Sequence, residues 1–198
     1  VMNELDALVN IDLDKKEFKK EHTALQLFRL GTCGSVNPDV EVDNMLVSEN
    51  VVGLDGLLHF YIDYDFENEF SKNFLEKFPY EKIKPLLYFS EWTASQYEYF
   101  KDAKYVGNTA TFPGFYAPQG RQLRLKSTDD QFLEVLNDLG VTNFEMETSA
   151  IYGLSKLLGH KAITINNVIA NRRRGEFAAD HHQSEKMMIE WVLERVIK

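Results

Sequence analysis

The chain has 198 residues, of which 44% are hydrophobic, so it can bury one sizeable core and we expect a single domain over residues 1–198. Its net charge of −9 would repel a nucleic-acid backbone, which argues against that class of partner and requires a few placed arginines to hold any bound anion. The single cysteine, the lack of an apolar run long enough to span a bilayer and the lack of a signal-peptide pattern at the start predict a cytoplasmic protein with no membrane partner.

The N-terminal half is predicted to begin with a helix and to continue with buried strands. Apolar residues recur at helical spacing over residues 1–9. The apolar stretch 24–30 runs directly into the small residues 31–35, which predicts a strand followed by a turn. A second strand is expected over 45–52, whereas the aromatic and charged stretch 63–100 predicts helices and loops of a lid or a subunit contact.

The C-terminal half continues this alternation. A strand over 105–112 leads into a Pro- and Gly-rich turn, and Ser127 with Asp130 is the expected start of a helix that Gly140 ends. Further on, strands are expected over 143–146 and 161–170, and helices over 149–158 and 184–197. Because strands and helices alternate, the pattern indicates the α/β class.

A cation and a hydroxyl stand at the end of the first predicted strand, in Arg29-Leu30-Gly31-Thr32-Cys33-Gly34. The guanidinium can bind an anion through two nitrogens, and Thr32 and the backbone N–H groups of the glycines add short donors, which suits a phosphate dianion. An Arg in a surface ion pair beside a structural turn would give the same pattern. No histidine beside Cys33 supports its activation, so we interpret it as a small buried residue rather than a nucleophile.

Two carboxylates flank a methionine in Glu145-Met146-Glu147. One carboxylate can accept hydrogen bonds from both vicinal hydroxyls of a ribose, and its charge favours an electron-deficient sugar carbon nearby. A helix entry enriched in acids is the alternative interpretation.

A third segment, Phe115-Tyr116-Ala117-Pro118-Gln119-Gly120-Arg121, joins an aromatic ring to an amide and a cation. The Gln119 amide can accept from the N3–H of uracil and donate to a neighbouring oxygen, Arg121 can donate to the other oxygen, and Phe115 can stack on a base. A polar loop after a turn would look the same.

With the fourth segment, Val168-Ile169-Ala170-Asn171-Arg172, these motifs run through nearly the whole chain, and they resemble the nucleoside phosphorylases of the uridine and hexameric purine type. The resemblance implies a three-layer α/β/α fold with a mixed central sheet. It also implies cleavage of a nucleoside by inorganic phosphate, without a metal or an organic cofactor.

The resemblance further implies a role for each matching residue. The expected phosphate-binding residues are Arg29, Gly31 and Thr32, and the expected ribose-binding residues are Thr32, Glu145, Met146 and Glu147. The expected base-binding residues are Gly34, Phe115, Gln119, Arg121, Ile169 and Arg172. The catalytic residues are expected to be Arg29, Glu147, Gln119 and Arg121.

The choice of base depends on Asn171. Purine phosphorylases and related nucleosidases place an Asp at this strand end to protonate the purine, and an amide cannot supply that proton. Uracil leaves as a delocalised anion for which hydrogen-bond donors suffice, so we expect a uridine phosphorylase. A purine phosphorylase, a nucleosidase that uses water, and a nucleoside-binding protein of the same fold without turnover are the alternatives. Thymidine and deoxyuridine share the edge that Gln119 would read.

One family motif has no counterpart before Arg29, the Gly-Asp-Pro-x-Arg loop that supplies further phosphate donors. We therefore expect this chain to lack the N-terminal part of the family domain. The family site also takes an Arg and a His from a neighbouring subunit, which implies a homodimer or a hexamer with the site at the dimer interface.

Overall fold

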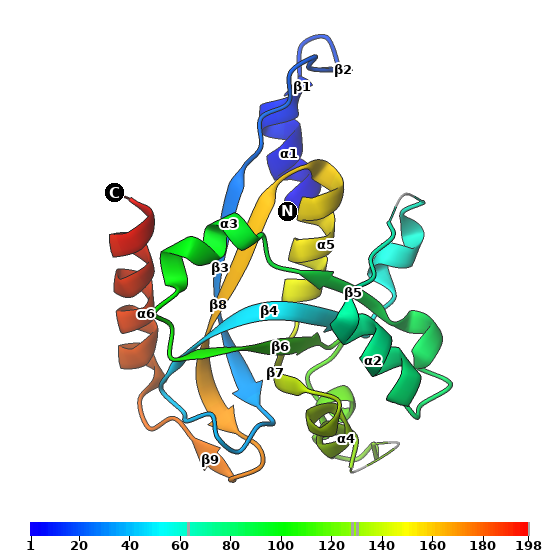
Figure 1. The fold of residues 1–198 in the computed structure, drawn as a ribbon, viewed down its shortest axis with the longest axis vertical. Coiled ribbons are helices and arrows are strands. Elements are labelled where there is room, and N and C mark those ends of the chain that lie inside the picture. The colour runs from blue at the N-terminus through cyan, green and yellow to red at the C-terminus, as the bar shows by residue number, and fades with distance from the viewer. Residues whose placement is uncertain (63, 128, 130, 198) are drawn as a thin grey trace.

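The computed structural model describes residues 1–62, 64–127, 129 and 131–197. Its body is a seven-stranded mixed sheet in the order β5-β4-β6-β7-β3-β8-β9 (Figure 1). The strands are β3 (Gln26–Ser35), β4 (Met45–Gly53), β5 (Tyr88–Glu91), β6 (Tyr105–Thr111), β7 (Val141–Glu145), β8 (Lys161–Asn171) and β9 (Glu176–Phe177). The α/β class and the mixed sheet expected from the sequence are thereby confirmed.

The sheet curls strongly. Strand β4 runs parallel to β6 on one side, and on the other it pairs with β8 in the antiparallel direction, from Met45 opposite Asn167 to Ser48 opposite Thr164. Strands β4, β6, β7, β3 and β8 therefore form a closed ring of hydrogen-bonded pairs. Buried polar side chains of four of these strands are hydrogen-bonded to one another, namely Ser48, Thr109, Asn143 and Asn166.

Helices cover the sheet on opposite sides of β3 and β8 in Figure 1. Helix α6 (His181–Val196) places Met188 and Val192 against Ile163 and Ile165 of β8. Helix α5 (Thr148–Leu158) packs Tyr152 in a second cluster on the sheet. The remaining helices are α1 (Met2–Asn10), α2 (Glu69–Lys77), α3 (Ala94–Tyr97) and α4 (Phe132–Asp138), with 3-10 turns η1 (Leu57–Phe60), η2 (Lys84–Leu86), η3 (Glu98–Phe100) and η4 (Ala117–Gln119).

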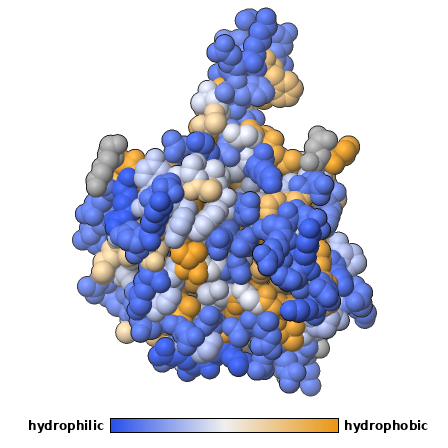
Figure 2. Space-filling model, in the orientation of Figure 1, coloured by the Kyte–Doolittle hydropathy of each residue, from blue (hydrophilic) through white to orange (hydrophobic). Residues whose placement is uncertain are grey.

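A short hairpin of β1 (Ile11–Asp12) and β2 (Glu17–Phe18) follows α1 and projects from the body (Figure 1). Figure 2 shows that the visible face of the molecule is mainly hydrophilic, with smaller apolar areas on the body. Among the residues that the structure describes, no helix combines the length and the apolar character that crossing a membrane requires.

The predicted turn at residues 31–35 is wrong, because β3 continues to Ser35. Its parallel partner β8 pairs with it from Gln26 opposite Lys161 to Ser35 opposite Asn171, with one irregularity between Cys33 and Gly34. Ladder hydrogen bonds along this length outweigh the weak strand preference of glycine.

Two further predictions need correction. The stretch 63–100 contains a strand, β5, which has only four residues and pairs with the end of β4. A run this short shows little of the periodic pattern that identifies a strand in a sequence. Helix α4 begins at Phe132 after Gln131, not at Ser127, whose hydroxyl binds the backbone of Asp129 instead. The predicted partner Asp130 lies outside the described residues.

Candidate functional site

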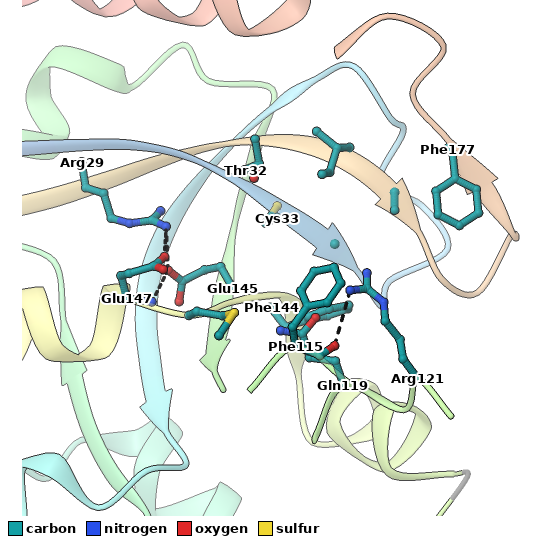
Figure 3. A pocket seen from close by; sticks show the side chains of 14 residues that line it. Arg29, Thr32, Cys33, Phe115, Gln119, Arg121, Phe144, Glu145, Glu147 and Phe177 are labelled. Atoms are coloured by element: carbon teal, nitrogen blue, oxygen red, sulfur yellow. Dashed lines mark hydrogen bonds and ion pairs between the residues drawn. The ribbon is translucent and has the colours of Figure 1, made fainter. Parts of the chain in front are cut away.

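A pocket of about 210 Å³ opens where β3, β7 and β8 meet the segment 115–121 and β9 (Figure 3). Most of the predicted site residues line it together, although they come from four separate parts of the chain. These residues are Arg29, Thr32, Gly34, Phe115, Gln119, Arg121, Glu145, Met146, Glu147 and Ile169. Gly31 and Arg172 are the predicted site residues that do not line it.

At one end of the pocket, the Arg29 guanidinium lies beside two carboxylates (Figure 3). Its Nη2 lies 3.1 Å from Glu145 Oε2 and also forms an ion pair with Glu147 Oε2. The Glu145 side chain is 1% exposed, whereas that of Glu147 is 57% exposed. Glu147 is therefore the carboxylate that a ligand can reach.

Glu145 is committed to the protein itself. Its Oε1 accepts from the Thr111 hydroxyl at 2.6 Å, and its Oε2 accepts from the backbone N–H groups of Glu147 at 2.9 Å and Thr148 at 2.8 Å. These N–H groups lie at the start of α5, where a carboxylate is favoured by the helix dipole. Glu145 thus anchors the turn from β7 into α5 and presents Glu147.

Two glycines of β3 make room for this arrangement. A Cβ on Gly31 would lie 2.4 Å from Nη1 of Arg29, and one on Gly34 would lie 2.6 Å from the Phe144 ring. Gly31 therefore acts by letting the guanidinium cross over it, which explains why it does not line the pocket itself. Gly34 allows Phe144 to form part of the pocket wall.

At the other end of the pocket lies an amide side chain without a hydrogen-bond partner among the described residues, that of Gln119. Gln119 is only 3% exposed, and its side chain makes no hydrogen bond to any residue in the described part of the chain. A buried amide normally has partners, because an unmatched donor or acceptor costs about 1–3 kcal/mol. This amide lines the pocket, so it is available to a ligand.

An aromatic and a cation lie beside Gln119. The Cζ of Arg121 lies 3.6 Å from the centroid of the Phe115 ring, and Arg121 Nη1 is 3.4 Å from the Phe115 carbonyl oxygen. Burial lowers the pKa of Arg121, and the nearby charge of Arg172 lowers it further. Arg172 thus acts on the site through its charge, while its backbone N–H donates to Ser35 at 2.9 Å.

Asn171 has a structural role that the sequence did not reveal. Its Nδ2 donates to the carbonyl oxygens of Asn37 and Val40 at 2.9 and 2.7 Å, and its Oδ1 accepts from the N–H groups of Arg173 and Arg174. It is 1% exposed and does not line the pocket. Among the lining residues, the acids are Glu145 and Glu147, both at the Arg29 end.

Cys33 lines the pocket as a neutral thiol. Burial raises its pKa to about 12, so it is a poor nucleophile near neutral pH. Within the described ranges, the group of side chains close enough to share a metal ion is His181, His182 and Glu185, at the start of α6 and outside the pocket.

Besides Cys33, four residues at the site were not among the predicted site residues. Phe144, Ala170 and Phe177 line the pocket. Asn166 does not line it, but its Oδ1 accepts a hydrogen bond from Arg29 Nη1 at 2.8 Å. Phe177 belongs to β9, which the turn at Gly175 with its positive φ of 65° folds back onto β8. That glycine was the signal that could have predicted a hairpin here.

A family model described as the phosphorylase superfamily matches residues 8–198. The chain belongs to this superfamily. Among curated proteins of the superfamily, it is 28% identical to a uridine phosphorylase from Haemophilus influenzae over 75% of this chain and 54% of that protein. It is 26% identical to a DeoD-type purine nucleoside phosphorylase from Shewanella loihica over 91% of this chain and 67% of that protein.

A solved structure of a Trypanosoma brucei nucleoside phosphorylase, described as showing uridine phosphorylase activity, superposes with a TM-score of 0.86. The identity is 26%, and the match covers 99% of this chain and 75% of that one. This chain thus spans between about half and three quarters of the length of these relatives. The resemblance to nucleoside phosphorylases that the four motifs carried is confirmed.

Proposed function

We propose that the protein is a uridine phosphorylase, which converts uridine and inorganic phosphate to uracil and ribose 1-phosphate. The observation that carries this proposal is the buried, unpartnered amide of Gln119 at one end of a pocket whose other end holds Arg29 and Glu147. An amide can match the N3–H and a carbonyl oxygen of uracil together. The relatives described as uridine phosphorylases support the same choice.

In the proposed reaction, a phosphate oxygen attacks the anomeric carbon of the ribose as the bond between that carbon and N1 of uracil breaks. The electron pair of this bond passes to the uracil ring, where Gln119 and Arg121 stabilise the charge on its oxygens. The uracil anion then takes a proton from solvent.

Glu147 has two tasks in this reaction. Its exposed carboxylate would accept hydrogen bonds from the ribose hydroxyls, and its charge would stabilise the electron-poor sugar carbon. Arg29 and Thr32 would orient the phosphate, with Met146 against the sugar. Holding the reactants in this order lowers the barrier without a metal or an organic cofactor.

Purine nucleosides are the alternative substrates, because several relatives are described as purine nucleoside phosphorylases. Protonation of a purine requires an acid near the base, and the described lining residues offer none at the Gln119 end. The amide of Asn171 is occupied by backbone groups. These observations favour the pyrimidine.

The remaining parts of the proposal concern the assembly. We infer a homodimer or a hexamer in which a neighbouring subunit completes the phosphate site, because the resemblance to nucleoside phosphorylases implies that an Arg and a His of that subunit take part. A cytoplasmic location stays a prediction.

The proposal is tested by a substrate panel with saturating phosphate, using uridine, deoxyuridine, thymidine, inosine and adenosine. The protein should be expressed with whatever sequence flanks residues 1–198 in its gene. We expect uridine to be cleaved with the highest kcat/KM and inosine to be a poor substrate. Glu147→Gln should retain the fold and lose on the order of 10²-fold in kcat. A parent protein that cleaves inosine faster than uridine would contradict the pyrimidine assignment.

A further inference from the structure

We infer that Asn166 is a positioning residue, which fixes the guanidinium of Arg29 in the orientation that binds the anionic co-substrate. The inference rests on the proposed function, because it assigns the anion to the Arg29 end of the pocket. Asn166 lies behind Arg29, in the middle of β8, and is fully buried.

The strand register brings these groups together. Arg29 and Gly31 are two residues apart on β3, so their side-chain positions lie on the same face of the sheet. On the neighbouring strand Asn166 stands opposite Gly31. The Arg29 side chain therefore crosses Gly31, where a Cβ would be 2.4 Å from Nη1, and reaches Asn166 Oδ1 at 2.8 Å.

The two terminal nitrogens of the guanidinium have different partners. Nη2 binds the carboxylates of Glu145 and Glu147, whereas Nη1 donates to Asn166. Contacts at one nitrogen alone would let the planar group swing about that nitrogen, and the second contact fixes its plane. The Nε–H makes no hydrogen bond within the part of the chain that the structure describes, so this donor remains available to an anion.

The orientation of the Asn166 amide is itself fixed. Its Nδ2 donates to Ser48 Oγ at 3.1 Å, and this hydroxyl lies 2.6 Å from Thr109 Oγ1, which is 2.8 Å from Asn143 Oδ1. All these side chains are fully buried inside the ring of strands. The network leaves the Asn166 carbonyl oxygen pointing to Arg29.

The neutral charge of this group also matters. Two carboxylates already contact the guanidinium at Nη2, and a third carboxylate would add to the negative charge that repels a phosphate dianion. An amide supplies the acceptor that holds Nη1 without adding negative charge.

Asn167 offers a matched control. It is the next residue on β8, it is equally buried, and its amide nitrogen donates to Ser184 Oγ at 2.8 Å, on the opposite face and away from the pocket. Asn167→Ala therefore removes a buried amide from the same strand without touching Arg29.

The test compares Asn166→Ala with Asn167→Ala by two measurements. Titration calorimetry with inorganic phosphate alone gives its Kd, and steady-state kinetics with uridine give the KM for each substrate. We expect Asn166→Ala to raise the Kd and the KM for phosphate about tenfold or more and to leave the KM for uridine within about twofold. Asn167→Ala should lower Tm and leave both constants unchanged.

Asn166→Asp adds an isosteric variant, which should fold even if the alanine does not, because the new carboxylate faces a guanidinium. It keeps the acceptor and adds a charge, so its phosphate affinity should also fall. Phosphate constants that equal those of the parent in both Asn166 variants would overturn the inference, as would equal losses in the Asn167 control. If the parent binds phosphate but releases no uracil, the proposed uridine phosphorylase activity is contradicted. A higher Kd for phosphate in the Asn166 variants alone would still support the positioning role.

Discussion

Replacing Asn171 by Asp would restore the acid that purine phosphorylases are expected to carry at this strand end, yet the structure predicts a loss of stability and no purine activity. The Asn171 amide nitrogen donates to the carbonyl oxygens of Asn37 and Val40, and its oxygen accepts from the turn at 173–174. A carboxylate keeps the acceptor, but it loses both donor bonds and places its charge against two carbonyl oxygens.

The magnitude follows from these contacts. A buried group left without its hydrogen bond costs about 1–3 kcal/mol. The Val40 carbonyl bond is buried and the Asn37 carbonyl bond only partly buried, so the Asn37 carbonyl should contribute at the lower end of this range. Together, the two lost bonds should lower the free energy of unfolding by about 2–4 kcal/mol. For a chain of this size 1 kcal/mol corresponds to about 2–4 °C in Tm, so we expect Tm to fall by about 10 °C. Scanning calorimetry measures the change.

Asn37→Asp is the control for this experiment. Its amide oxygen accepts from the backbone N–H of Asp39 at 2.8 Å, and its amide nitrogen makes no hydrogen bond in the described residues. The same chemical change should therefore cost far less there. Equal Tm values for the two variants, or rapid inosine cleavage by Asn171→Asp, would refute the structural role of Asn171.

Three other outcomes are expected. Gly31→Ala should displace the Arg29 guanidinium, which passes over this glycine. Because hydrogen bonds to charged groups are worth about 1.5–3 kcal/mol, the KM for phosphate should rise about 10- to 150-fold. An unchanged KM for phosphate would contradict this path of the Arg29 side chain. Gln119→Ala should lower kcat/KM for uridine about 5- to 150-fold with the phosphate KM retained, and a full loss of phosphate binding would argue against separate ends of the pocket. A thiol reagent at pH 8 should modify Cys33 only after unfolding, since burial raises its pKa to about 12. The unfolded thiol ionises first, so the free energy of unfolding should fall as the pH rises from about 9.0 to about 12, a slope that Cys33→Ala should reduce.

Much of the fold could be predicted from local patterns. The strands that became β4, β6 and β8 are rich in apolar and β-branched residues, and Gly159 ends α5 in the left-handed conformation, as its place after the last apolar residue suggested. The turn at 31–35 could not be judged from glycine content, because the long pairing partner of β3 lies over 130 residues away. Closure of the ring through β4 and β8 is likewise a non-local property.

The site also contains residues that the sequence could predict and residues that it could not. Motif residues such as Arg29, Gln119 and Glu147 could be placed in one pocket because their segments resemble those of nucleoside phosphorylases. Their roles in binding stay predictions. Asn166 stands in an apolar strand with no motif of its own, and its contact with Arg29 depends on the register of β3 against β8. Sequence alone does not supply that register.

The most direct test of the proposed activity is uracil release from uridine, followed by absorbance across a titration with phosphate. Arg29 and Thr32 offer donors that suit a dianion far better than a neutral water. Uracil release should rise with phosphate, nearly vanish without it, and yield ribose 1-phosphate. Free ribose that forms at an undiminished rate in phosphate-free buffer would instead show a hydrolase and contradict the account.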